Sequence, residues 1–177
     1  METQLTLLTR QSCRSFTENQ ITDKELNILL KSANSAPVSM GIYDDVELCI
    51  IQNKEMIAEI EQTVSCAIPS LGEHPVYNAP TIILINCKKE DAEKAPLAYC
   101  NASCIAENIM ISATDLGLGS VYLYAVPCVL SQVDSFYEKL QIREGFFPAV
   151  AVAIGTPQHE LDLKKARTDK IGEKIFL

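Results

Sequence analysis

The sequence predicts an α+β fold, and three observations lead to that class. Short runs of β-branched and apolar residues have the length and composition of buried strands. Longer segments repeat apolar residues at the spacing of an amphipathic helix. The two kinds of segment do not alternate strictly, as they would in a doubly wound parallel sheet. The 177 residues, of which 47% are apolar, suit a single domain with a well-developed core.

The first part of the chain is expected to be helical. Residues 5–9 are typical of the end of a short helix. Thr22 and Glu25 form a capping box, in which each side chain bonds a backbone N–H that the first helical turn leaves unpaired. The helix that follows carries leucines at helical spacing. It should end before Pro37, because the residue ahead of a proline avoids helical geometry.

Two strands and a helix are expected in the middle of the chain. Residues 46–52 and 81–87 are β-branched and apolar, and the second run is apolar enough to be covered on both faces. Asn53 is a suitable N-cap for the helix between them. Residues 65–80 contain three prolines and a glycine, which predicts an irregular connection of a length typical of a lid or a binding loop.

The longest predicted helix spans residues 98–116. Its polar residues are few, namely Asn101, Ser103, Glu107, Asn108, Ser112, Thr114 and Asp115. A helix that is apolar around most of its circumference must be widely buried, and in a small domain a subunit interface is a natural second cover. Gly117 follows at the place where a helix C-cap glycine belongs.

Three shorter elements complete the predicted fold. A strand is expected at residues 120–124, a helix capped by Ser131 follows it, and a last strand is expected at residues 149–154. The tail ends in the apolar residues 175–177. We expect this end to dock on another surface, such as that of a second subunit.

The charge of the chain excludes one class of partner. The net charge is −8 and the isoelectric point is near 4.8. Non-specific binding to nucleic acid depends instead on clustered lysine and arginine. The N-terminus has neither a basic region nor a long apolar stretch, and the longest apolar runs are strand-sized. We therefore expect a cytoplasmic protein that binds neither nucleic acid nor membrane.

Cysteine and histidine give little sign of catalytic or metal chemistry. The seven cysteines are odd in number and lack a CxxC pair, which favours reduced thiols in a cytosol. Cys100 and Cys104 would share a helix face, where small buried residues are favoured over a functional pair. The two histidines, His74 and His159, have no GxSxG motif near them, and paired spacings typical of zinc sites are absent. Neither a hydrolase nor a metal site is expected.

One basic segment stands out in this acidic chain, Arg10-Gln11-Ser12-Cys13-Arg14. Its two guanidinium groups match the geometry of phosphate oxygens, and its serine hydroxyl donates readily to another oxygen. An exposed helix terminus whose arginines pair with carboxylates explains the same residues equally well. Lys164, Lys165 and Arg167 form a second basic cluster, which would either complete a phosphate site or be a solvated charge run.

The order of several short motifs resembles that of the FMN-dependent nitroreductase family over most of the chain. Residues 10–16 resemble the family's Arg-Arg-Ser-x-Arg-x-Phe opening, with Gln11 at a frequently basic position. Ala36-Pro37-Val38-Ser39 stands where the family's helix ends in Ala-Pro-Ser. Residues 41–45 lack the Asn and Gln that larger members carry next, so this chain looks like a compact branch of the family.

The second half of the chain continues the same order. Leu116-Gly117-Leu118-Gly119-Ser120 matches the family's Leu-Gly-Leu-Gly-Ser turn, and Tyr124 replaces a usual glycine shortly after it. Ile154-Gly155-Thr156-Pro157 resembles the end of the last core strand. Lys165-Ala166-Arg167 resembles the C-terminal Lys-x-Arg pair that meets the FMN phosphate.

The resemblance implies a fold, an assembly and a set of cofactor-binding residues. The fold would be a central mixed or antiparallel sheet flanked by helices, in an intertwined homodimer with two FMN sites at the subunit interface. The phosphate and ribityl chain would be held by the segment containing Gln11 and by Arg10, Ser12, Arg14, Lys165 and Arg167. The flavin ring would be covered from the other subunit by Pro37, Val38, Ser39 and Met40, and lined on its other side by Tyr122, Leu123 and Tyr124.

The resemblance also implies the reaction. The protein would be an NAD(P)H-dependent flavin oxidoreductase that reduces nitroaromatic, quinone or similar small acceptors by hydride transfer through flavin N5. No catalytic side chain is expected, because the cofactor carries the chemistry. One alternative is a flavin-binding or sensory module of the same fold with little turnover, which the altered loop at residues 41–45 motivates. Another is a thiol-redox or metal protein, which the seven cysteines motivate.

Overall fold

Four antiparallel strands form one sheet in the order β1-β2-β4-β3. The computed structural model describes residues 2–89, 95–162 and 175. The strands are β1 Val46–Ile51, β2 Thr81–Lys88, β3 Gly119–Leu123 and β4 Phe146–Gly155. The two central strands, β2 and β4, are buried along almost their whole length. The sequence patterns therefore predicted all four strands to within a few residues, and the α+β class is confirmed.

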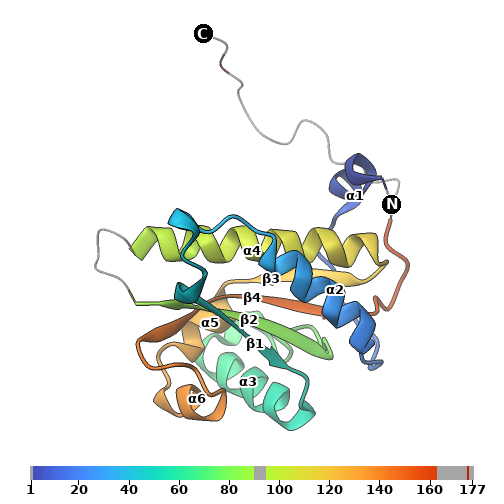
Figure 1. Ribbon diagram of the computed structural model, residues 1–177. Helices are drawn as coiled ribbons and strands as arrows, with labels where there is room; N and C mark the ends of the chain where they lie inside the picture. Colours follow the sequence, from blue (N-terminus) through green and yellow to red (C-terminus); the bar gives the residue numbers. More distant parts are fainter. Residues whose placement is uncertain (1, 90–94, 163–174, 176–177) are drawn as a thin grey trace.

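Helices cover both faces of this sheet (Figure 1). α2 and α4 lie on one face, with α1 packed beside α4, and α3, α5 and α6 lie on the other. Their bounds are α1 Thr3–Thr9, α2 Asp23–Asn34, α3 Lys54–Ala67, α4 Ala95–Asp115, α5 Ala125–Leu130 and α6 Asp134–Lys139. Three single 3-10 turns lie in the connections, η1 Ser39–Gly41, η2 Tyr43–Asp45 and η3 Pro69–Leu71. Within the described residues, no helix combines the length and the hydropathy needed to cross a membrane.

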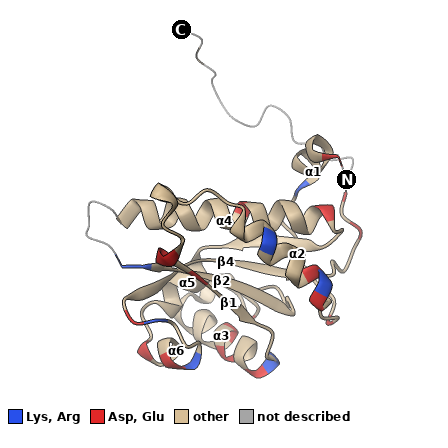
Figure 2. Ribbon diagram, viewed as in Figure 1, with Lys and Arg blue, Asp and Glu red and all other residues tan. Residues whose placement is uncertain are grey.

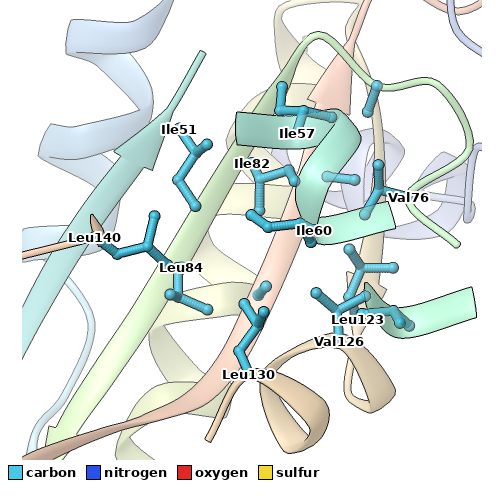
Figure 3. Packing of buried hydrophobic residues seen from close by; sticks show 14 of the residues in the cluster. Ile51, Ile57, Ile60, Val76, Ile82, Leu84, Leu123, Val126, Leu130 and Leu140 are labelled. Atoms are coloured by element: carbon cyan, nitrogen blue, oxygen red, sulfur yellow. The ribbon is translucent and has the colours of Figure 1, made fainter. Parts of the chain in front are cut away.

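The two faces of β2 build separate halves of the core. Ile82 and Leu84 pack with residues of α3 and α5 (Figure 3), whereas Ile83 and Ile85 belong to the cluster under α4. The alternation follows from the strand's period of two residues. Full burial of each such side chain contributes roughly 1.5–3 kcal/mol, which explains why a strand covered on both faces is apolar at nearly every position.

Helix termini are set by the residues expected to cap them. The Thr22 side chain accepts a hydrogen bond from the N–H of Glu25, and the Glu25 carboxylate accepts one from the N–H of Thr22 at 2.7 Å. Asn53 caps α3 through the N–H of Met56 at 2.8 Å. Gly117, with a φ of 76°, ends α4, because few other residues adopt this left-handed geometry without strain.

Several local predictions were wrong. Ser131 is the C-cap of α5 rather than the N-cap of the following helix, and α6 begins at Asp134. α5 was not expected because it contains Pro127, yet proline is tolerated in a first turn, where the backbone N–H has no partner inside the helix. Cys100 and Cys104 are exposed on α4, not buried. In addition, α3 continues to Ala67, so the irregular connection begins later than expected.

Candidate functional site

The basic segment at residues 10–14 lies directly against the start of β3. Ser12 forms a parallel bridge with Ser120, and the N–H of Cys13 donates to the carbonyl of Ser120 at 2.9 Å. Gly119 permits this approach, because a Cβ atom there would lie 2.7 Å from the Cys13 sulfur. The glycine of the Gly-Ser turn therefore has a packing role: it lets the basic segment lie against the strand.

Both arginines of the segment have defined neighbours. The Nε atom of Arg10 lies 3.4 Å from a carboxylate oxygen of Glu107 on α4, and the Arg10 side chain is only 22% exposed. Arg14 is exposed, and its guanidinium carbon lies 6.0 Å from the centre of the Tyr77 ring. The carboxylate and the ring each hold one guanidinium group near the segment, while its other N–H groups remain able to meet an anion.

Gln11 links the segment to the end of the described chain. Its side-chain amide donates to the carbonyl of Asp162 at 3.3 Å and to that of Thr9 at 3.3 Å. Lys165 and Arg167, the other predicted phosphate ligands, lie outside the described residues. The chain nevertheless leads into that part of the tail from a point beside Gln11.

A buried hydroxyl without a partner lies at the same place. Ser120 is 1% exposed, and its Oγ atom has no hydrogen-bond partner among the described residues. Buried polar groups are rarely left unpaired, because the loss of hydration costs about 1–3 kcal/mol. Together with the serine and arginines of the neighbouring segment, this hydroxyl suits a ligand that carries polar oxygens.

The predicted ring-lining residues continue along the same strand. Tyr122 and Leu123 end β3, and Tyr124 is the N-cap of α5 instead of a strand residue. At a rise of about 3.3 Å per residue, Ser120 and Leu123 are about 10 Å apart, so the strand spans from an anion-binding end to an apolar end. This arrangement fits an elongated cofactor with a phosphate at one end and a ring at the other.

The turn at Pro37–Met40 lies away from this strand-bound segment within the same chain. It is held at the N-terminal part of α4, where the N–H of Ser39 donates to the side-chain oxygen of Asn101 at 2.9 Å (Figure 1). Val38 is buried, but Met40 is 89% exposed and has a φ of 55°. One chain therefore places the predicted phosphate segment against Ser120 of the strand that carries Tyr122 and Leu123, and it holds the predicted ring-covering turn at the N-terminal part of α4.

Three polar residues of α4 organise these segments, and they were not singled out from the sequence. Glu107 meets Arg10, Asn101 meets Ser39, and the hydroxyl of Ser103 lies 2.9 Å from that of Tyr122. Their signal in the sequence was their polarity within an otherwise apolar helix. That signal marks them as unusual, but it does not identify their partners.

Two buried thiols and one histidine have structural environments. Burial raises the pKa of the Cys13 thiol, and it raises that of Cys87 to about 12, so both thiols stay protonated. His74 pairs with Glu61 at 3.1 Å, away from the segment at residues 10–14 in sequence and on a different loop. Within the described ranges, no three His, Cys, Asp or Glu residues gather as a metal site would require.

Comparison with known proteins identifies the family. The family model described as "Nitroreductase family" matches residues 7–156. An Archaeoglobus fulgidus protein named as an NADH dehydrogenase/NAD(P)H nitroreductase is 29% identical over 162 residues, which cover 90% of this chain and 88% of the relative. The "FMN reductase (NADPH)" of Bacillus subtilis is 27% identical over 176 residues, covering 93% of this chain and 69% of the relative.

Solved structures agree on the fold. A nitroreductase with bound FMN from Desulfitobacterium hafniense superimposes with a TM-score of 0.84 at 21% identity, covering 100% of this chain and 98% of the other. A nitroreductase with bound FMN from Bacteroides fragilis gives 0.81 at 23% identity, with 100% and 99% covered. The nitroreductase fold is thus shared over the whole chain. The family match over residues 7–156 and this fold lead to one conclusion: the chain belongs to the nitroreductase family.

Proposed function

We propose that the protein is an FMN-dependent oxidoreductase that uses NAD(P)H to reduce small acceptors such as quinones and nitroaromatics. One observation carries the proposal. The basic segment lies beside the unpaired Ser120 hydroxyl near the start of β3, and Tyr122 lies near the end of the same strand. Relatives named as an NAD(P)H nitroreductase and an FMN reductase, and neighbours that hold FMN, support the same reaction.

The chain's own residues bind and orient the cofactor. Arg10, Ser12 and Arg14 neutralise and bond the phosphate, with Lys165 and Arg167 joining them from the tail, because guanidinium and ammonium groups make charge-assisted bonds to phosphate oxygens. Tyr122, Leu123 and Tyr124 line one side of the ring. When bound, the flavin supplies hydride transfer from NAD(P)H to the acceptor. No side chain is assigned a catalytic proton transfer, and water serves as the proton source.

A homodimer is part of the proposal. Large apolar side chains are exposed on α1, in the N-terminal part of α4 and in the turn held there, namely Leu5, Leu7, Leu8, Met40, Ile42, Tyr43, Leu97 and Tyr99. Figure 2 shows that α4 carries few charges, whereas α2, α3 and α6 carry many. Exposed large apolar side chains on neighbouring elements favour an interface. A second copy would cover it, and its Pro37–Met40 turn would reach the ring that one chain leaves open.

The compartment follows from the thiols. All seven cysteines are free, which is typical of a reducing cytoplasm. The proposal therefore places the enzyme in the cytoplasm, with no nucleic acid or membrane among its partners.

The visible spectrum tests the cofactor and the reaction separately. Purified protein is mixed with FMN, freed of excess ligand, and then mixed anaerobically with NADPH or NADH in a stopped-flow instrument. We expect one flavin per chain and bleaching of its absorbance by at least one nicotinamide. Failure to retain flavin would contradict the proposed function.

The same experiment separates the enzyme from a flavin-binding module with little turnover. The loop at residues 41–45 motivates that alternative, because the Tyr43 hydroxyl donates to the Ala36 carbonyl at 3.2 Å and no amide side chain of this loop is available for the ring. Retained flavin without bleaching, or bleaching without reoxidation by a quinone or a nitroaromatic compound, would favour the module over the enzyme.

A further inference from the structure

A pocket between α3 and the loop that leads into β2 is lined by none of the residues assigned to the cofactor. Its volume is about 270 Å³, which suits a molecule smaller than a flavin. Three parts of the chain line it. The residues are Glu18, then Lys54, Ile57, Ala58 and Glu61 of α3, and Asn78, Ala79 and Pro80 of the loop.

One of these residues is a buried carboxylate that is only half paired. Glu61 is 9% exposed, and its Oε2 atom lies 3.1 Å from Nδ1 of His74. The other oxygen, Oε1, is buried and has no hydrogen-bond partner among the described residues. Burial of a carboxylate is costly unless donors replace its hydration shell. Glu61 therefore has the capacity to accept a further, charge-assisted hydrogen bond.

The geometry of α3 directs this carboxylate toward the pocket. The lining residues of α3 are spaced by three or four positions, so they share one face of the helix. Side chains of a helix lean toward its N-terminus. The carboxylate of Glu61 thus lies over the preceding turn, which carries Ile57 and Ala58, and that turn forms a wall of the pocket.

The remaining walls determine which donor fits. Ile57 and Ala79 are buried, and with Pro80 they give the pocket apolar walls. Lys54 lies two helical turns before Glu61, about 10 Å along the axis, and its side chain leans away from the carboxylate. Across the ranges that the structure describes, no three His, Cys, Asp or Glu residues gather as metal ligands. Apolar walls beside a single buried carboxylate suit an organic cation rather than a metal ion.

We propose that this pocket binds a small primary amine, whose ammonium group donates to Oε1 of Glu61 while its alkyl chain lies against Ile57 and Ala79. An ammonium group carries three donors and the complementary charge. Glu18, which is exposed, adds a second negative charge to the lining and favours entry of a cation. The site is separate from the proposed flavin site and does not depend on it.

Backbone amide chemical shifts of the isotope-labelled full chain test the site, with and without FMN. The protein is titrated at about pH 8 with n-butylamine, which is protonated there as a lysine side chain is. We expect saturable shifts at residues 57–61 and 78–79, with a dissociation constant in the millimolar range. n-Butanol, which matches the amine in length but carries no charge, should bind at least about tenfold more weakly.

Three variants locate the ammonium group. Glu61→Gln keeps the size of the side chain but removes its charge, and it should weaken n-butylamine at least about tenfold. Ala58→Leu adds bulk at an exposed position of the pocket wall, and it should block the amine even if Glu61→Gln fails to fold. Glu55→Gln removes the same charge from an exposed position in the first turn of α3. This matched control should bind the amine like the unmodified protein.

Three outcomes would overturn the amine site. The first is the absence of saturable shifts in the unmodified protein at amine concentrations well above the millimolar range. The second is equal binding of n-butylamine and n-butanol, which would show that the carboxylate contributes nothing. The third is amine binding that Glu61→Gln and Ala58→Leu leave unchanged. None of these outcomes bears on flavin retention, so failure of the amine site and failure of the proposed function are distinguishable.

Discussion

The two predicted cofactor segments of this chain are supported in different ways. The segment at residues 10–14 is bonded to the backbone of β3 and held by Glu107, so its geometry is complete within one chain. The turn at Pro37–Met40 is tied to α4 by a hydrogen bond from its Ser39 N–H to Asn101, and it exposes Met40 almost fully. The difference teaches that the proposed phosphate-binding segment is held by contacts within one chain, whereas the proposed ring cover would need a second copy to complete it.

The largest loss of FMN affinity is expected when both arginines of the segment at residues 10–14 are removed. A charge-assisted hydrogen bond contributes roughly 1.5–3 kcal/mol, so Arg10→Ala with Arg14→Ala should raise the dissociation constant for FMN about 100-fold. Equilibrium titration by flavin fluorescence measures it. Lys24→Ala with Lys31→Ala, which removes the same charge from exposed positions of α2, is the matched control. If both double variants bind FMN like the unmodified protein, the segment does not hold the phosphate.

A smaller loss of FMN affinity should follow when the segment at residues 10–14 is displaced from β3. Gly119→Ala places a methyl group 2.7 Å from the Cys13 sulfur, and overpacking of this kind costs about 1–3 kcal/mol. We expect lower thermal stability together with weaker FMN binding. Gly155→Ala creates a similar clash with Pro80, at 2.6 Å, and should lower stability with little effect on FMN affinity. Equal FMN affinities in the two variants would show that contact with β3 does not position the segment.

Loss of the hydrogen bond that anchors the Pro37–Met40 turn should lower the free energy of local opening of this turn by about 1 kcal/mol. Asn101→Ala removes the acceptor for the Ser39 N–H, and an intramolecular hydrogen bond contributes roughly 0.5–1.5 kcal/mol. We expect faster amide hydrogen exchange at residues 39–41 and FMN affinity reduced a few-fold at most. Asn108→Ala, which removes a bond from the same helix to the Ser32 carbonyl, is the control. Exchange that speeds up equally at the turn in both variants would rule out a specific anchor.

The smallest expected effect is a pH-dependent change in Tm. It arises in the loop that carries His74 and Tyr77, beneath Arg14. The hydrogen bond with Glu61, assisted by the charges of Glu61 and Glu73, raises the pKa of His74 above its ordinary value of 6.5. A raised pKa means that the pairing stabilises the folded state fully below about pH 6.5 and is lost as pH rises through the folded-state value. The difference in Tm between the unmodified protein and His74→Gln should therefore shrink between about pH 5.5 and pH 8.5.

This pH dependence also bears on the strand-bound segment. His74 and Tyr77 share one loop, and the Tyr77 ring lies under the Arg14 guanidinium. A Tm difference between the two proteins that stays constant with pH would show that the charge of His74 does not contribute to holding this loop.

Sequence patterns predicted most of the fold because the relevant physics is local. The capping box at Thr22 and Glu25, the Asn53 cap and the Gly117 terminus each act within a few residues of their own position. Strand β2 was recognised because burial on both faces leaves a continuous apolar run. α5 was missed because a helix of six residues containing a proline has almost no periodic signal.

The candidate site rests on the order of motifs along the chain. That order identified the segment at residues 10–14, the turn at 37–40 and the strand end at 122–124 as candidates, and the structure places the first against Ser120 of the strand that ends in the third. The roles assigned to Lys165 and Arg167 stay predictions, since both lie outside the described residues.

By itself, the sequence determined most of the elements, the caps of α2 and α3 and the family, since periodicity and motif order are properties of the chain alone. The tertiary structure decided which residues meet. Asn101 reaches Ser39 across 62 positions, and Ser103 reaches Tyr122 across 19. No local pattern encodes such pairs, because they arise only when α4 packs over the sheet. The same packing holds the segment at residues 10–14 through Glu107 and leaves Met40 of the Pro37–Met40 turn exposed.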